Sequence, residues 1–438
     1  MAEKLSVFST QHSALRVLVL NSGSSSLKFR VYDIQVPSAP QPSSNHQIAT
    51  SSHPSLGAQH LALSTVVSGA ITGIGHHAVL RIVGATHTDE RPIRGHDDAA
   101  RWVLEQIDRT SIQAVGHRVV HGGQQFTQPV RITDTVVAEI ERLGELAPLH
   151  NPPSLAVIEA ARAVFGDAVP MVAVFDTAFH AGMPATGSDY AIPTDLAARH
   201  HIRRYGFHGI AHAALAGAYA TTTGHPLEQL RLITLQLGNG CSAAAVRGGR
   251  SVDTSMGMTP LEGLVMGTRS GDIDPSVVAY LSRREGVTPE IIEEWLNERS
   301  GLLGLSGLSN DVRELLKAEQ DGHRQAALAL DLFCYRVRKY IGAYLAVLNG
   351  ANAVIFGGGI GERAAVIRER ICAEMAWCGL VLNPSRNAAA NAPQPGEALQ
   401  ISSDSASLPA YVVGVDEESV IARETVSCLR SAERLAPP

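Results

Sequence analysis

A strand, a glycine-containing turn and a returning strand occur near the start of each half of the chain, and this repetition constrains the fold most strongly. Residues 18–25 and 235–242 share the pattern L-x-L-x-x-G-x-S. Apolar, β-prone residues at 15–20 and 232–237 predict buried strands, and 27–32 and 242–246 predict the strands that return from the turns. So short a match can arise by chance. Its place at the front of each half nevertheless favours two domains of related architecture.

The rest of the chain alternates predicted strands with predicted helices. Further strands are predicted at 79–83, 114–118, 170–175, 353–356 and 411–415, and helices at 97–107, 154–165, 274–281, 326–348, from 362 onward and at 417–429. This alternation predicts an α/β fold with a largely parallel sheet core. A chain of 438 residues suits two domains, which we expect at 14–179 plus 416–438 and at 180–415. A stretch rich in Pro, Ser, Gln and His at 37–54 predicts an exposed loop.

Composition argues against several classes of protein. The formal net charge of −6 gives no electrostatic footprint for nucleic acid or an anionic membrane. The five cysteines include no CxxC pair, which argues against a disulfide framework or a zinc site and suits a reducing compartment. Neither a signal peptide nor a long apolar membrane span is evident. We therefore expect a cytoplasmic protein that binds neither nucleic acid nor membrane.

Three glycine-rich turns, each after a short apolar strand, could offer backbone N–H groups to a phosphate. They lie at 21–26, just before Lys28, at 238–240 and at 357–361. A single turn of this kind is most often only a turn, whereas three of them favour phosphate binding. None has the Walker A or the G-x-G-x-x-G pattern. Phosphate held between two hairpin tips instead indicates an actin-like kinase fold of two lobes.

Several charged residues stand where a binding site could form. Arg118 and Arg269 lie in polar segments from which a guanidinium fork could hold a carboxylate or phosphate, although a solvated loop is the alternative for each. Asp176 ends a buried strand and could hold Mg²⁺ or orient an arginine. His208 lies between Phe207 and a glycine at a predicted helix start, which favours anion contact over a purely structural role.

These residues belong to a series of motifs that resembles the acetate kinase family over almost the whole chain and in the family's order. The motifs are N-x-G-S-S-S-x-K from Asn21, G-H-R-V-V-H-G-G from Gly116, A-P-L-H-N-P-P from Ala147, V-F-D-T-A-F-H from Val174, R-Y-G-F-H-G from Arg204, L-G-N-G from Leu237, P-L-E-G-L-V-M-G-T-R-S-G-D-I-D-P from Pro260, N-D-V-R from Asn310 and G-G-I-G-E from Gly358. The length of several motifs argues against coincidence.

The resemblance implies two actin-like, ribonuclease-H-like lobes with a nucleotide cleft between them, and a homodimer joined through the second lobe. It implies reversible, direct in-line transfer of the γ-phosphoryl group of ATP to acetate, giving acetyl phosphate and ADP, with Mg²⁺ or alternatively Mn²⁺ as the metal. A carboxylate is already ionised near pH 7, because its reference pKa is about 4, so the reaction needs no general base. Catalysis is then mainly alignment and neutralisation of charge.

The resemblance also implies roles for individual residues. The catalytic set is Arg118, His150, Asp176, His208 and Arg269. The pocket for the substrate methyl group, next to Arg118, is formed by Val120, Leu149, Phe207 and Pro260. The metal lies near Asn21 and Glu417. The nucleotide is bound by Ser24, Ser26, Lys28, Gln236, Leu237, Gly238, Asn239, Gly240, Asp311, Val312, Arg313, Gly358, Gly359, Ile360, Gly361 and Glu362.

The sequence departs from the family pattern at a few positions, including Gln236 in place of a common His, Gly357 in place of Thr and Arg363 in place of Asn. A propionate or butyrate kinase of the same family is an alternative, because one methylene is worth only about 1–3 kcal/mol in an apolar pocket. A non-catalytic nucleotide-binding module of the same fold is a second alternative. The two retained arginines disfavour it, since binding ATP alone does not require cations for an acceptor.

Overall fold

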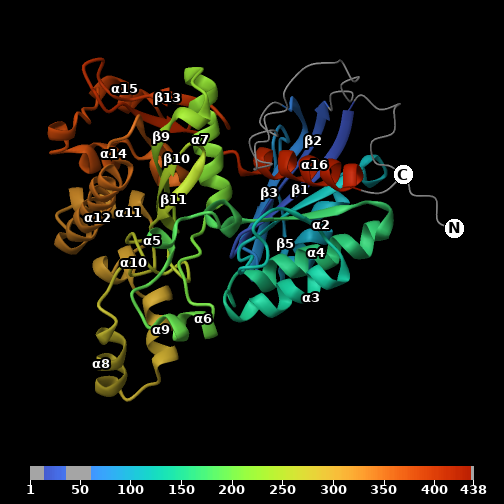
Figure 1. Cartoon of the computed structure of the whole chain (residues 1–438), viewed down its shortest axis with the longest axis horizontal. Helices are drawn as coiled ribbons and strands as arrows, with labels where there is room; N and C mark the ends of the chain where they lie inside the picture. Colours follow the sequence, from blue (N-terminus) through green and yellow to red (C-terminus); the bar gives the residue numbers. More distant parts are fainter. Residues whose placement is uncertain (1–13, 36–60, 436–438) are drawn as a thin grey trace. The chain divides into compact units, whose positions relative to one another are not determined.

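The computed structural model describes residues 14–35 and 61–435, so the predicted exposed loop at 37–54 lies outside the described residues. Contacts divide the chain into two compact units. The first comprises Met1–Ala178 and Glu417–Pro438, and the second comprises Phe179–Asp416. Each unit has one β-sheet with helices packed on it (Figure 1).

The sheet of the first unit has eight strands in the order β5-β4-β3-β2-β1-β6-β8-β7. These strands are β1 (Ala14–Ser22), β2 (Ser26–Gln35), β3 (Leu63–Thr72), β4 (His77–Ile82), β5 (Asp89–Pro92), β6 (Ala114–Val119), β7 (Val130–Arg131) and β8 (Met171–Phe175). The predicted first hairpin is confirmed, since β1 and β2 pair antiparallel with Ser22 opposite Leu27. β6 lies parallel to β1 and β8 lies parallel to β6, so the carboxyl ends of these three strands meet at one sheet edge.

Helices cover both faces of this sheet. They are α2 (His96–Glu105), α3 (Asp134–Arg142), α4 (Asn151–Phe165) and α16 (Glu417–Leu435). Val115 of β6 packs in one core with Trp102 of α2 and Val157 of α4. Because side chains alternate along a strand, the next residue faces the other way, and a Cβ at Gly116 would lie 2.3 Å from Thr425 Oγ1 of α16. The last helix therefore closes the second face of a sheet built from the start of the chain (Figure 1).

The sheet of the second unit has six strands in the order β11-β10-β9-β12-β14-β13. They are β9 (Arg231–Leu237), β10 (Cys241–Arg247), β11 (Arg250–Thr254), β12 (Ala353–Gly357), β13 (Ala398–Gln400) and β14 (Ala410–Val413). The helices are α5 (Ala185–Ser188), α6 (Thr194–Arg199), α7 (Gly209–Thr223), α8 (Ser276–Glu285), α9 (Pro289–Glu298), α10 (Gly301–Ser306), α11 (Val312–Gln320), α12 (Arg324–Leu348), α13 (Gly358–Arg363), α14 (Ala365–Cys372) and α15 (Pro384–Ala389). None of the helices in the described part of the chain is both long and apolar enough to cross a membrane.

The two units share one topology. The order β3-β2-β1-β6-β8 in the first corresponds to β11-β10-β9-β12-β14 in the second. The hairpin with the glycine turn is formed by β1 and β2 in the first unit and by β9 and β10 in the second. α2 and α4 pack together in the first unit, as α12 and α14 do in the second. α7 covers β9, β12 and β14 on the side of the sheet away from α12, as Figure 1 shows. The repeated sequence pattern therefore marks equivalent places in two related folds.

Two predictions about the backbone are wrong. The sheets are not largely parallel, because only β1-β6-β8 and β9-β12-β14 run parallel and every other pairing is antiparallel. Glycine turns fold neighbouring strands back on each other, and only the helical crossovers give parallel neighbours. The glycine run at 357–361 is not a turn, since all but its first residue belong to the short helix α13.

Glu424 of α16 gives a testable consequence of this packing. Burial raises the pKa of its carboxyl to about 7, from an ordinary value of 4.5. The folded state thus holds this proton more tightly than the unfolded state, so stability falls as pH rises from about 4.5 to about 7. We expect Glu424→Gln to raise the free energy of unfolding at pH 8 by up to about 3 kcal/mol, and by little at pH 4.5. Thermal unfolding at both pH values measures this difference.

The exposed Glu141 of α3 provides the control for this measurement. Glu141→Gln should leave unfolding nearly unchanged at both pH values, since an exposed carboxylate stays hydrated. An equal gain for Glu424→Gln at pH 4.5 and pH 8 would show that the buried carboxylate is not the cause.

Candidate active site

Arg118 and Asp176 form a buried ion pair at the carboxyl-end edge of the first sheet. Arg118 is the fifth residue of β6 and Asp176 directly follows β8. The Nη2 of Arg118 donates to Asp176 Oδ2 at 2.7 Å, and its Nε donates to both carboxylate oxygens at 3.2–3.3 Å. The side chain of Arg118 is 13% exposed and that of Asp176 is 0% exposed. Asp176 therefore orients an arginine, one of the two roles that its position predicts.

Asn21 joins this pair to the start of α16. Its Oδ1 accepts from Arg118 Nη1 at 3.3 Å, and its Nδ2 donates to Glu417 at 2.7 Å and to Glu418 at 2.8 Å. Burial by itself lowers the pKa of Arg118, but the carboxylates of Asp176, Glu417 and Glu418 outweigh it, so the pKa lies above its ordinary value. Arg118 is therefore held permanently charged.

The hydrogen bonds of Arg118 leave little of its fork for a ligand. Its Nη1 also donates to the carbonyl of Ser22, at 3.2 Å. A guanidinium has five N–H groups, and four of them point at Asp176, Asn21 and Ser22. A bidentate grip of Arg118 on an anion, as its sequence position suggests, is thus absent from this arrangement. One Nη2 N–H and the positive charge remain for a substrate.

The tip of the first hairpin is tight and open to solvent. The Gly23 N–H donates to the Ser26 carbonyl at 2.8 Å, and Ser24 and Lys28 are exposed. The described residues of the first unit thus place the predicted Ser24 and Lys28 on its surface.

His150 directly precedes α4. The first residue of this helix, Asn151, exchanges hydrogen bonds with the backbone of His121 at 3.0 Å.

In the second unit, a chain of hydrogen bonds runs inward from His208. This residue precedes α7 in a left-handed conformation, with φ 56°, which is uncommon for a non-glycine residue. Its Nδ1 lies 2.9 Å from Ser242 Oγ, the same hydroxyl lies 2.8 Å from His212 Nε2, and His212 Nδ1 lies 2.8 Å from Thr234 Oγ1. Burial holds the pKa of His212 well below its ordinary value, so this imidazole is neutral. The chain fixes the ring of His208.

Arg269 lies beside His208 and has no anionic partner within residues 14–35 and 61–435. A Cβ built on Gly240 would lie 3.4 Å from His208 Nε2 and 3.5 Å from Arg269 Nη1. Arg269 donates to the carbonyl of Pro260 at 3.1 Å and approaches Met266 Sδ at 3.8 Å, and among the described residues no ion pair involves it. Burial lowers its pKa. A bound anion would stabilise this guanidinium.

The loop that carries Arg269 is firmly held and is not a solvated turn. The Gly267 N–H donates to the Asn239 carbonyl at 2.8 Å, and the Gly263 N–H donates to Asp272 Oδ1 at 2.9 Å. Asp272 in turn accepts from Arg336 of α12 at 2.9 Å. The backbone of Arg269 is therefore fixed against both the second hairpin and the longest helix.

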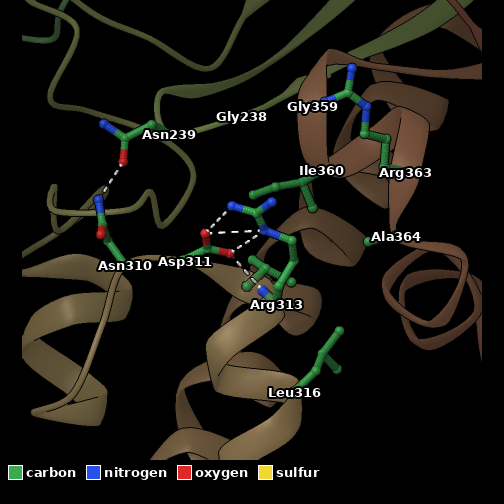
Figure 2. Close-up of a pocket in the computed structure, with 11 residues that line it drawn as sticks. Gly238, Asn239, Asn310, Asp311, Arg313, Leu316, Gly359, Ile360, Arg363 and Ala364 are labelled. Carbon is green, nitrogen blue, oxygen red and sulfur yellow. Dashed lines mark hydrogen bonds and ion pairs between the residues drawn. The ribbon is translucent and has the colours of Figure 1, made fainter. Parts of the chain in front are cut away.

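A pocket of about 440 Å³ opens between the second hairpin, α11 and α13 (Figure 2), within the size range of small-molecule sites. Asn310 Nδ2 donates to Asn239 Oδ1 at 3.0 Å across one side of it. On another side Arg313 folds back on Asp311, which caps α11. The pocket is lined by Gly238, Asn239, Asn310, Asp311, Val312, Arg313, Leu316, Gly359, Ile360, Arg363 and Ala364.

The pocket brings together only part of the predicted nucleotide set. Gln236, Leu237, Gly240, Gly358, Gly361 and Glu362 do not line it. Leu237 is fully buried, and the backbone of Gly358 lies so close to it that a Cβ would stand 2.6 Å from the Leu237 carbonyl oxygen. Four lining residues were not predicted: Asn310, Leu316, Arg363 and Ala364. Asn310 begins the N-D-V-R motif and Arg363 directly follows G-G-I-G-E, so these two motifs are the available signal.

The four residues predicted to surround a substrate methyl group belong to both units and differ in exposure. Val120 in the first unit and Phe207 in the second are buried. Leu149 is 53% exposed, and Pro260 is half-buried with its carbonyl on Arg269. Each unit thus contributes one buried and one accessible apolar residue.

The two sheets share the topology of an actin-like α/β protein. The pocket lined by Gly238 and Gly359, together with the cation of Arg269, is suited to binding phosphate. A model of the acetokinase family matches residues 16–423. The acetate kinase of Chloroherpeton thalassium is 44% identical over 429 residues, which cover 96% of this chain and 100% of that protein. The acetate kinase of Solibacter usitatus is 45% identical over 430 residues, covering 95% and 98%.

Solved structures agree with this assignment. Porphyromonas gingivalis acetate kinase matches with a TM-score of 0.79 and 35% identity, over 95% of this chain and 100% of that one. A propionate kinase from Francisella tularensis matches with a TM-score of 0.79 and 36% identity, over 94% and 99%. The chain belongs to the acetokinase family, and its two units have the actin-like fold of that family.

Proposed function

We propose that this chain is an ATP:acetate phosphotransferase, which transfers the γ-phosphoryl group of ATP to acetate and catalyses the reverse reaction from acetyl phosphate and ADP. The observation that carries the proposal is the unpaired Arg269 beside His208 and Gly240, in a chain about 44% identical to acetate kinases over nearly its full length. The pocket lined by Asn239, Asp311 and Gly359 would hold the nucleotide.

The proposed chemistry needs no acid or base. A carboxylate oxygen of acetate forms a bond to the γ-phosphorus while the bond from that phosphorus to the bridging oxygen of ADP breaks, and no proton moves. The transferring group carries its charge on three equatorial oxygens, which cations and N–H donors can stabilise. Arg269 supplies a charge with no competing carboxylate, His208 supplies a ring held in place by Ser242, and Arg118 supplies a fixed positive charge.

Mg²⁺ would accompany the nucleotide. Within residues 14–35 and 61–435, no group of three or more His, Cys, Asp or Glu side chains could hold a metal ion by itself. This fits Mg²⁺, which usually binds through one or two carboxylates together with substrate phosphates and waters. Glu417 is the carboxylate that we assign to it, with Asn21 orienting that carboxylate through its amide nitrogen. Bound in this way, the ion would neutralise phosphate charge during transfer.

The hydrogen-bond chain behind His208 predicts a specific loss of turnover. Ser242→Ala removes the hydroxyl that bridges His208 and His212, so the ring of His208 loses its fixed orientation. We expect kcat to fall by about tenfold, with little change in the KM for ATP, because the nucleotide pocket is untouched. Ser402→Ala, at another buried serine of this unit, should leave kcat unchanged. Equal kcat values for both variants would exclude the orienting role of Ser242.

The choice of acid is tested by a panel of substrates. The likeness to a propionate kinase, as strong as that to an acetate kinase, favours propionate as a second candidate substrate. Acetate, propionate and butyrate should each be incubated with ATP and Mg²⁺, and the acyl phosphate trapped with hydroxylamine. We expect kcat/KM to be highest for acetate. A maximum at propionate or butyrate would reassign the substrate, and the absence of any acyl phosphate with intact ATP binding would refute the kinase function.

We further propose that the protein acts in the cytoplasm as a homodimer joined through the second unit. The family resemblance supports the dimer, and the five free cysteines suit a reducing compartment. Sedimentation at micromolar concentration tests the dimer, since a single species of 46.4 kDa would contradict it.

A further inference from the structure

Arg368 of α14 is the only fully buried arginine among the largest buried side chains of the described residues, with 0% of its surface exposed. No carboxylate pairs with it in the part of the chain that the structure describes. Burial lowers its pKa to about 10, which leaves it charged at neutral pH. An unpaired buried charge costs several kcal/mol unless its donors are satisfied. The surroundings of Arg368 must therefore offset this cost.

All five N–H groups of the guanidinium meet a neutral oxygen. Nε donates to Asn387 Oδ1 at 2.8 Å, and Nη2 donates to the carbonyls of Asn387 at 2.6 Å and Ala390 at 2.7 Å, at the end of α15. Nη1 donates to the carbonyls of Gly361 at 2.9 Å and Glu362 at 3.1 Å. A lysine has three donors on one atom and cannot bond both helix ends in this way.

The carbonyls of Gly361 and Glu362 belong to the C-terminal turn of α13. The last carbonyls of a helix have no partner within it, and an arginine side chain can supply one. Helix α13 has only six residues, so these bonds fix a large part of it. Asn387 ties the same place to α14, since its Nδ2 donates to the Ala365 carbonyl at 2.9 Å.

Helix α13 is also one wall of the pocket. Figure 2 shows Gly359, Ile360 and Arg363 on the segment that borders it. These residues stand immediately before and after the two carbonyls that Arg368 holds. A shift of the C-terminal turn of α13 would therefore move the wall of the pocket, although Arg368 itself does not line it.

We propose that Arg368 is a positioning residue for the nucleotide, which caps α13 from behind and fixes its wall of the pocket against α15. The inference rests on the proposed function, because it takes the pocket to be the nucleotide site. Arg368 itself touches no substrate. Its proposed role goes beyond stabilising the fold, because it fixes one wall of the pocket.

Arg368→Lys tests the inference, because lysine keeps the charge and loses the fork. We expect the KM for ATP to rise by about tenfold or more, with the KM for acetate unchanged and kcat lowered less than threefold. Asn387→Ala is the milder second variant, for use if the lysine protein does not fold. It removes one acceptor from Arg368 and should raise the KM for ATP by about threefold. An unchanged KM for ATP in the variant that folds would overturn the inference.

Arg338 of α12 provides a matched control. It caps the neighbouring helix α14 through the carbonyls of Ile371 at 3.1 Å and Arg370 at 2.6 Å, and it does not contribute to the pocket. Arg338→Lys should lower the melting temperature without changing the KM for ATP. If Arg338→Lys and Arg368→Lys raised the KM for ATP equally, the effect would be general loosening of the unit and the positioning role would be lost.

A third variant separates the inference from the placement of the nucleotide. Ile360→Trp fills the pocket from its wall and should raise the KM for ATP if the nucleotide binds there. An increase with Ile360→Trp but none with Arg368→Lys would refute the role of Arg368 alone. No increase with Ile360→Trp would show that the nucleotide binds elsewhere and would remove the basis of both proposals.

Discussion

Replacement of Arg269 by alanine should lower kcat for acyl phosphate formation by about a thousandfold, the scale measured when a charge-stabilising donor is removed from a phosphoryl or acyl transfer site. Folding should be nearly unaffected, because among the described residues no carboxylate pairs with Arg269, and the acceptors that lose it are the Pro260 carbonyl and Met266 Sδ. Arg269→Lys should recover little activity, since an ammonium lacks the planar fork. Hydroxylamine trapping gives kcat, and thermal unfolding gives stability.

The exposed Arg299, which forms a surface ion pair with Glu294, is a suitable control for Arg269. Arg299→Ala should keep normal turnover and normal stability. Near-normal turnover of Arg269→Ala would remove the single observation on which the proposed function depends most. A melting temperature far below that of Arg299→Ala would instead show that Arg269 stabilises its loop.

Arg118→Ala should affect folding and turnover together. Asp176 is fully buried, and removal of Arg118 takes away the cation beside its carboxylate, which costs about 3–5 kcal/mol of stability. This loss should shrink as pH is lowered, because the protonated form of Asp176 needs no counter-charge. We expect kcat to fall at least about a hundredfold in the protein that remains folded.

The double variant Arg118→Ala/Asp176→Asn separates the two effects. Without the carboxylate, most of the lost stability should return, whereas turnover should not, because the positive charge beside the substrate is still missing. Denaturant unfolding and acyl phosphate formation on the same samples give both quantities. Recovery of turnover along with stability would show that Arg118 serves only to hold Asp176.

Much of the fold follows from local sequence signals. Both hairpins, the long helix at 326–348 and the final strand and helix are confirmed, because each combines an apolar period with a glycine turn or a cap that acts over a few residues. The direction of strand pairing is not local. Strand β8, for example, pairs parallel with β6 and antiparallel with β7, although the helices α3 and α4 separate it from both in the sequence. The apolar pattern at 170–175 does not specify either neighbour.

The sequence indicates many of the residues of the candidate site, but it does not indicate which of them contact one another. Arg118 and Asp176 were each found as polar residues at strand ends, yet only the parallel register of β6 and β8 turns them into a pair. The sequence does not predict site roles for Glu418, which accepts from Asn21, or for Ser242 and His212, which support the ring of His208. A lone serine or histidine in an apolar stretch has no periodicity or spacing that distinguishes an orienting role from ordinary packing.

The origin of α16 at the far end of the chain has a consequence for biosynthesis. The face of the first sheet around Gly116 lacks its contacts with α16 until the nineteen residues of this helix have been made. Protein domains commonly fold as they leave the ribosome, in order from the amino terminus. Here the order is reversed, because the described strands of the second unit all precede Glu417, whereas the first unit is completed only when α16 has been made.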